Sequence, residues 1–265
     1  MNTLEPFYFG PSGKPLWGCY HEPDTEARRD CAIVVCYPMG HEYIQFHRAC
    51  RQLASLLCNG GYPVLRFDFY GCGDSSGDCG EGRIDRWLAD ISAAVGEIRR
   101  RCGSIKICLT GLRLGGALST LAGAARGDID AMVLWDAVVR GRTYVKELRS
   151  LQREMLQRAH LRPTSDENRQ EALGFILTDH MLRDLEGIDL LAIRQKPANK
   201  ILVIESHNQP DQNPLAQHLR NLHSEVTHRH LPNPQFWHWV EDFTHVPVPQ
   251  QILQSVKSWI TEVYP

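Results

Sequence analysis

The sequence predicts an α/β protein: a mostly parallel, twisted sheet with helices on both faces and an inserted helical cap. Three observations support this class. Short apolar runs rich in β-branched residues recur along the chain, longer segments with helical spacing separate them, and one long interval contains no strand-like run. Runs of the first kind are typical of strands buried on both faces, and their alternation with helices predicts parallel pairing through right-handed crossovers.

The central strands of the predicted sheet are apolar runs closed by Pro, Gly or Asp, which is typical of buried strands. Ahead of them, "FYFG" and "PLWGCYHEP", joined by "PSGK", predict an antiparallel hairpin at the sheet edge. We expect the remaining strands at 31–38, 62–69, 104–111, 130–136, 200–206 and near 225–231.

The segments between these runs have the spacing of helices. "FHRACRQLASLLCNGG" ends on a Gly pair that suits a helix C-cap. "DRWLADISAAVGEIRRRCG" places Trp87, Ile91 and Val95 on one stripe and ends with basic residues, which favour a helix C-terminus. We expect further helices near 214–222 and over "PQQILQSVKSWITEVY".

One interval breaks the alternation of strands and helices. From Val138 to about Lys196 the chain shows only helical patterns, such as "TYVKELRSLQREMLQRAH" and "QEALGFILTDHMLRDL". This interval is too long for a plain connection. We therefore expect a core formed by residues 1–136 and 198–265, with a helical cap, or lid, inserted at 137–197.

Composition narrows the class of partner. The formal charge of -2 gives no electrostatic reason to expect nucleic acid or an acidic membrane surface, and no apolar run approaches the length of a membrane span. The first residues lack the pattern of a secretion signal. The nine cysteines form no tight CxxC pair, so we expect reduced thiols and no metal site. These observations predict a cytoplasmic protein that binds a small-molecule substrate or ligand without a cofactor, and they leave its oligomeric state open.

Candidate site residues are those that follow the strands, because open parallel sheets bind ligands outside the carboxyl ends of their strands. Some of these residues carry titratable side chains, and others bring backbone N–H groups. They are Met39, Gly40, His41, Glu42, Arg113, Leu114, Asp136, Asp211 and His245.

Several stretches carry a family resemblance. "CLTGLRLGGALS" has the strand, Gly-rich turn and small-residue helix of a nucleophile elbow, with Arg113 at its centre. "DFYGCGDSSG", "YPMGHEY" and "THVPVPQQILQSV" resemble stretches of the serine aminopeptidase-like branch of the α/β-hydrolases, and "VLWDAVVRGRTYVKEL" resembles hydrolases associated with exosortase systems.

The resemblance implies an α/β-hydrolase fold and ester, thioester or other acyl substrates. It also implies that His245 is the catalytic histidine and that Leu114 and Met39 or Gly40 supply oxyanion N–H groups. The usual acid position falls on Gln209, so the acid is either Asp211, two residues later, or Asp136 at the end of the preceding strand.

Arg113 departs from the pattern, because a guanidinium stays protonated and cannot act as a nucleophile. Three interpretations follow. His245, oriented by Asp136 or Asp211, is a general base while Arg113 anchors an anion, with Glu42 and His41 beside the oxyanion loop. Alternatively, the site is inactive, and Arg113 pairs with a carboxylate in a protein that binds a ligand or a partner; the candidate carboxylates are Asp136, Glu42 and Asp74. In the third, a displaced nucleophile acts; the candidates are Ser75, Ser76, Cys72 and Cys36.

Overall fold

The computed structural model describes residues 3–24, 28–103, 106–160, 169–206, 213–232 and 248–265. Its main sheet has eight strands in the order β1-β2-β4-β3-β5-β6-β9-β10. The first hairpin is antiparallel, β2 pairs with β4 antiparallel, and the strands from β4 to β10 pair in parallel. The predicted mostly parallel sheet is thus confirmed. The strands are β1 (Thr3–Phe9), β2 (Leu16–Glu22), β3 (Cys31–Cys36), β4 (Val64–Phe67), β5 (Lys106–Leu112), β6 (Ala131–Trp135), β9 (Lys200–Glu205) and β10 (Glu225–His230).

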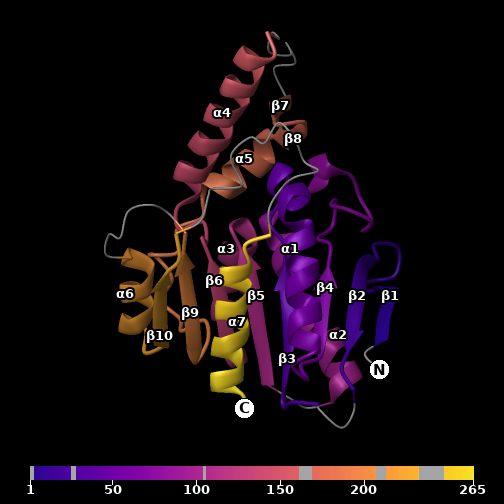
Figure 1. Cartoon of the computed structure of the whole chain (residues 1–265). Coiled ribbons are helices and arrows are strands. Elements are labelled where there is room, and N and C mark those ends of the chain that lie inside the picture. Colours follow the sequence, from indigo (N-terminus) through magenta and orange to yellow (C-terminus); the bar gives the residue numbers. More distant parts are fainter. Residues whose placement is uncertain (1–2, 25–27, 104–105, 161–168, 207–212, 233–247) are drawn as a thin grey trace.

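Helices cover both faces of the sheet (Figure 1). The sheet divides the hydrophobic core into two layers, one on each face. On one face lie α1 (His41–Cys58) and α7 (Gln250–Val263); on the other lie α2 (Ile84–Cys102), α3 (Leu114–Arg126) and α6 (Pro214–Asn221). The central strands are buried on both faces, because alternate residues of β3 point into each layer. This burial explains why they read as continuous apolar runs.

The segment between β6 and β9, called here the cap segment, lies at one end of the sheet (Figure 1). It contains α4 (Gly141–Arg158), β7 (Arg169–Ala172), β8 (Phe175–Thr178) and α5 (Asp179–Glu186). The purely helical pattern expected over "QEALGFILTDHMLRDL" is wrong in its first half, where β7 and β8 form a hairpin. Leu173 and Gly174 have φ of 52° and 87°, so the chain reverses there through two left-handed residues, as in tight hairpin turns.

Among the described residues, no helix combines the length and apolar character that crossing a bilayer requires. All nine cysteines are free thiols. In the same part of the chain, no three His, Cys, Asp or Glu side chains gather in a way that would hold a metal ion.

Candidate functional site

The turn from β5 into α3 has a strained backbone shape. Arg113 stands at its centre with φ 53° and ψ -120°, a conformation that costs a non-glycine residue about 1–3 kcal/mol. Glycines allow the close packing around it. A Cβ on Gly111 would lie 2.5 Å from the carbonyl oxygen of Gly115, and a Cβ on Gly115 would lie 2.3 Å from that of Cys36. Both separations are too short for van der Waals contact, so the turn requires glycine at these two positions.

Two carboxylates hold the buried side chain of Arg113. Its Nε donates to Oε1 of Glu42 at 2.8 Å, and its Nη2 donates to Oε2 of Glu147 at 2.8 Å. The guanidinium carbon lies 5.4 Å from the ring centroid of Tyr144, whose hydroxyl donates to Oε2 of Glu42 at 3.1 Å. Glu42 belongs to the first turn of α1, whereas Tyr144 and Glu147 lie on α4. This network, called here the elbow network, therefore joins the elbow, the core and the cap segment.

Burial and neighbouring charges shift the pKa values of two members of the elbow network, Arg113 and Tyr144. Burial opposes the charge of Arg113, but the carboxylates of Glu42 and Glu147 outweigh it and hold the pKa of the guanidinium above its ordinary value. Burial, followed by the charge of Glu42, raises the pKa of Tyr144 well above its usual range. The phenol thus remains a hydrogen-bond donor. With two carboxylates against one guanidinium, these three groups carry a formal net charge of −1.

Asp136 follows β6 and also has a positive φ, 45°. Its carboxylate accepts hydrogen bonds from the N–H of Ser206 at 2.8 Å and from the hydroxyl of Ser206 at 2.6 Å. Its own N–H donates to the carbonyl of Ile204 at 2.9 Å. The side chain is buried. A carboxylate fixed in this way is suited to orient a histidine, because it does not need to reorganise when the imidazole becomes charged.

Arg113 and Asp136 line one cavity of about 480 Å³. Tyr144 and Glu147 line it too, together with the start of α6. A second cavity, of about 30 Å³, is also lined by Tyr144. Apolar side chains of the cap segment line this cavity together with four residues that we expected around the oxyanion loop. These four are Met39, Gly40, His41 and Leu114. Tyr144 lines both cavities. The N–H of Leu114 belongs to the first turn of α3, where backbone N–H groups have no partner within the helix.

Ser75 has a structural position. Its hydroxyl donates to the carbonyl of Asp68 at 2.6 Å and accepts from the N–H of Trp17 at 2.8 Å, so it ties the loop after β4 to β2. Ser76 is held through its backbone N–H, which donates to the carbonyl of Pro15 at 3.0 Å. The hydroxyl of Ser75 is therefore used by two backbone groups, and Ser76 is fixed through its backbone.

The two candidate thiols are also poorly suited to attack a substrate. Burial raises the pKa of Cys36 to about 12 and raises the pKa of Cys72 above its ordinary range. A thiol must lose its proton to become a nucleophile. None of the four candidates for a displaced nucleophile therefore shows activation among the described residues.

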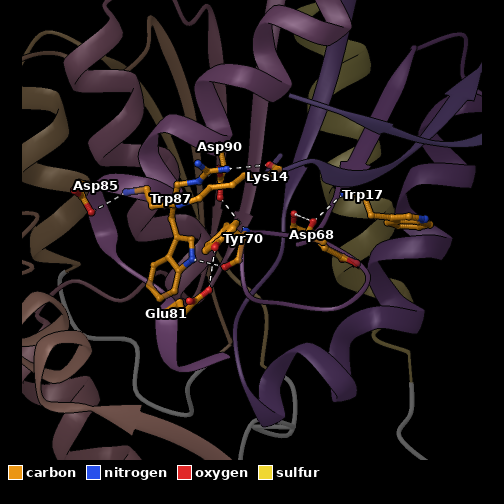
Figure 2. Close-up of polar contacts among 10 residues, drawn as sticks. Lys14, Trp17, Asp68, Tyr70, Glu81, Asp85, Trp87 and Asp90 are labelled. Atoms are coloured by element: carbon orange, nitrogen blue, oxygen red, sulfur yellow. Dashed lines mark hydrogen bonds and ion pairs between the residues drawn. The ribbon is translucent and has the colours of Figure 1, made fainter. Parts of the chain in front are cut away.

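The glycine loop that contains these serines is fastened to α2. Figure 2 shows Tyr70 between Asp90, Trp87 and Glu81, with Asp68 beside Trp17. The N–H of Tyr70 donates to Oδ2 of Asp90 at 2.9 Å, and Nε1 of Trp87 donates to the carbonyl of Tyr70 at 3.1 Å. The hydroxyl of Tyr70 donates to Oε2 of Glu81 at 2.9 Å. Hydrogen bonds with Asp90, Trp87 and Glu81 thus fix the position of the loop at Tyr70.

Two predicted site residues, His245 and Asp211, lie outside the described residues. Sequence reasoning missed three others: Tyr144, Glu147 and Ser206. Tyr144 and Glu147 are three residues apart in "TYVKEL", the spacing that places side chains on one helix face, and this signal could have identified them. Of the three carboxylates expected as partners of Arg113, the structure gives Glu42.

The chain is similar to known hydrolases. Residues 29–202 match the family model "Serine aminopeptidase, S33". A comparison with curated proteins gave no match. Among solved structures, Est1E from Butyrivibrio proteoclasticus with ferulic acid bound has a TM-score of 0.68 at 17% identity, covering 97% of this chain and 98% of that chain.

Two further solved structures have the same fold. XC6422 from Xanthomonas campestris, described as a serine hydrolase without a lid, has a TM-score of 0.60 at 15% identity over 99% of this chain and 95% of that one. The Pyrococcus furiosus esterase PF2001 has a TM-score of 0.63 at 15% identity over 98% and 91%. The predicted α/β-hydrolase fold is confirmed. Because the family model matches well over half of the chain, the protein belongs to the serine aminopeptidase S33 family of the α/β-hydrolase superfamily.

Proposed function

We propose that the protein is a hydrolase-type enzyme that cleaves an ester or thioester bond in a small molecule without forming a covalent intermediate at the elbow. One observation carries this proposal. Arg113, a permanent hydrogen-bond donor, and Asp136, a carboxylate fixed by Ser206, line the same cavity of about 480 Å³ at the carboxyl ends of the strands. A volume of this size suits a small ligand.

In the proposed reaction, water replaces the missing nucleophile. His245, oriented by Asp136, takes a proton from water while the water oxygen forms a bond to the acyl carbon. The carbonyl oxygen becomes an oxyanion and accepts hydrogen bonds from the N–H groups of Leu114 and of Met39 or Gly40. The bond to the leaving alkoxide or thiolate then breaks, and His245 returns its proton to that group. Arg113 holds an anionic part of the substrate.

A second candidate function is ligand binding without chemistry. The observation that favours it is the elbow network itself, since Glu42 and Glu147 already offset the charge of Arg113. In this alternative, the same cavity holds a ligand and the cap segment closes over it, but no bond is broken.

An activity screen separates the two functions. Wild type, Arg113→Ser, Asp136→Asn and His245→Ala are compared on ester and thioester panels, with a fluorophosphonate probe for activated serines. His180→Ala, which changes an exposed cap histidine, is the matched control. We expect turnover by wild type and by His180→Ala, a loss of about 100-fold or more in His245→Ala, and no probe labelling of wild type.

Other outcomes of the screen point elsewhere. Labelling of wild type by the probe would reveal a displaced serine nucleophile and refute the water mechanism. If wild type is inert and Arg113→Ser gains labelling, the remaining machinery is intact and the binding function is favoured. Turnover that is unchanged in His245→Ala would remove the general base from the proposal.

A further inference from the structure

The cap segment places a carboxylate of its own against Arg113. Glu147 and Tyr144 lie on the same face of α4, and both residues line the cavity of about 480 Å³ together with Arg113. Nη2 of Arg113 donates a hydrogen bond of 2.8 Å to Oε2 of Glu147. Nη2 of Arg113 is therefore occupied by a carboxylate of the same chain. A ligand that carries a carboxylate would offer the same chemistry at this atom.

The two carboxylates on Arg113 differ in how easily each can leave. Glu42 has an exposed fraction of 1% and accepts from both Arg113 and Tyr144. Its removal would leave two buried donors unsatisfied. The side chain of Glu147 has an exposed fraction of 27%. Once released, Glu147 can regain water, so its ion pair with Arg113 is the one that a ligand can replace.

From this asymmetry we propose that Nη2 of Arg113 is a subsite for a substrate carboxylate, and that Glu147 occupies this subsite until such a substrate displaces it. The inference rests on the proposed function, because it assigns the substrate class of the same cavity: an ester or thioester that also carries a carboxylate. The exchange conserves the ion pair of Arg113, since one carboxylate replaces another. A neutral substrate offers no such exchange and leaves Glu147 in place.

The proposal makes Glu147 a selectivity element. A tethered group acts at a high effective concentration, so a free carboxylate competes with Glu147 at a disadvantage. A substrate overcomes the disadvantage when the rest of it also fits the cavity, whereas simple anions bind wild type only weakly. Release of Glu147 also removes one of the contacts between α4 and the elbow, which couples substrate binding to the position of the cap segment.

The test measures the affinity of the protein for butyrate and for its neutral isostere, butyramide, by calorimetry in low salt. The variants are Glu147→Gln and, as the matched control, Glu154→Gln, whose exposed partner on the same helix is Arg158. We expect Glu147→Gln to bind butyrate roughly tenfold more tightly than wild type does. Glu154→Gln should match wild type, and butyramide affinity should not change in either variant.

Equal butyrate affinity in wild type and Glu147→Gln, or no butyrate binding by a folded Glu147→Gln, would overturn the inference. Thermal unfolding of each variant establishes that it is folded. The outcome is distinguishable from the fate of the proposed function. Tighter butyrate binding by Glu147→Gln in a protein without ester or thioester turnover supports the carboxylate subsite and refutes the hydrolase. Ester or thioester turnover, with equal butyrate affinity in wild type and Glu147→Gln, supports the hydrolase and refutes the carboxylate subsite.

Discussion

Two buried arginines lie at different places in this protein and are stabilised in different ways. Arg113 and Arg66 have exposed fractions of 5% and 3%. Arg113 binds the carboxylates of Glu42 and Glu147 at the end of the sheet. Arg66, within β4, donates from Nε to Nε2 of His21 at 2.9 Å and from Nη1 to the hydroxyl of Tyr37 at 2.6 Å.

The difference lies in which partners can be exchanged. The neutral acceptors of Arg66 are both buried, so this cation is locked into the β2–β4 region. Burial, followed by the charges of Arg66 and Arg51, lowers the pKa of His21 to about 4, and the ring therefore stays an acceptor. Among the described residues, Arg113 pairs with one carboxylate of this locked kind, Glu42, and with one that solvent reaches, Glu147. A buried cation with a replaceable partner is suited to a ligand, and one without is suited to structure.

The largest expected effect comes from breaking the locked side of the elbow network. Glu42→Ala leaves Arg113 Nε and the hydroxyl of Tyr144 without their acceptor, and we expect the free energy of unfolding to fall by about 3–5 kcal/mol. Urea denaturation measures it. Because these residues share one network, the double variant Glu42→Ala, Arg113→Met should lose less than the sum of the single losses. A loss below about 1 kcal/mol in Glu42→Ala would mean that the network reorganises, and the contrast with Glu147 would fail.

The second effect is a pH dependence that belongs to the Arg66 region. The folded pKa of His21 is about 4, whereas its ordinary value is 6.5. As pH falls below 6.5, His21 becomes protonated in the unfolded chain but stays neutral in the folded protein. The stabilising contribution is therefore present above pH 6.5 and is lost as pH falls toward 4, and it amounts to about 2 kcal/mol after solvent screening.

His21→Gln isolates this contribution, because glutamine still offers an acceptor to Arg66 but does not titrate. Urea denaturation of both proteins at neutral pH and near the folded pKa of His21 gives the two pH dependences. We expect the variant to lose less stability on acidification than wild type does. Identical losses would show that His21 takes up its proton as readily in the folded protein as in the unfolded chain, and the Arg66 site would then not be locked.

The smallest effect on stability is expected at the replaceable partner. Glu147→Gln removes a part-exposed ion pair, and we expect a change of no more than about 1 kcal/mol in the free energy of unfolding. Glu154→Gln, on the same helix, is the comparison. If Glu147→Gln costs about as much as Glu42→Ala, the two carboxylates are equivalent, and the asymmetry on which the carboxylate subsite depends does not exist.

The sequence predicted the fold because its signals were local. Strands such as β3 are buried on both faces, so their apolar runs identified them without knowledge of their neighbours. The β7–β8 hairpin was missed because its strands are short and its turn, at Leu173 and Gly174, interrupts a segment that otherwise has helical spacing. α1 begins at His41, where Gly40 turns the chain with φ 60°, and not at Phe46.

The site was predictable only where strand ends determine it. Arg113, Glu42 and Asp136 each follow a parallel strand, and a parallel sheet brings such residues to one edge. Tyr144 and Glu147 reach the same place from α4, whose position depends on how the cap segment packs. Ser206 follows β9, but only the pairing of β6 with β9 shows that it fastens Asp136. The three-residue spacing of Tyr144 and Glu147 indicates that they share a helix face, but no local pattern indicates which distant segment that face contacts.

The elbow turn is shaped by its glycines and by the strand beneath them, not by the side chain that it displays. Gly111 and Gly115 pack against backbone atoms whichever residue stands between Leu112 and Leu114. The backbone of the turn and the side chain that it displays are therefore determined separately at this position. A serine at position 113 would therefore suit the backbone of the turn, but it would leave the carboxylates of Glu42 and Glu147 without their cation.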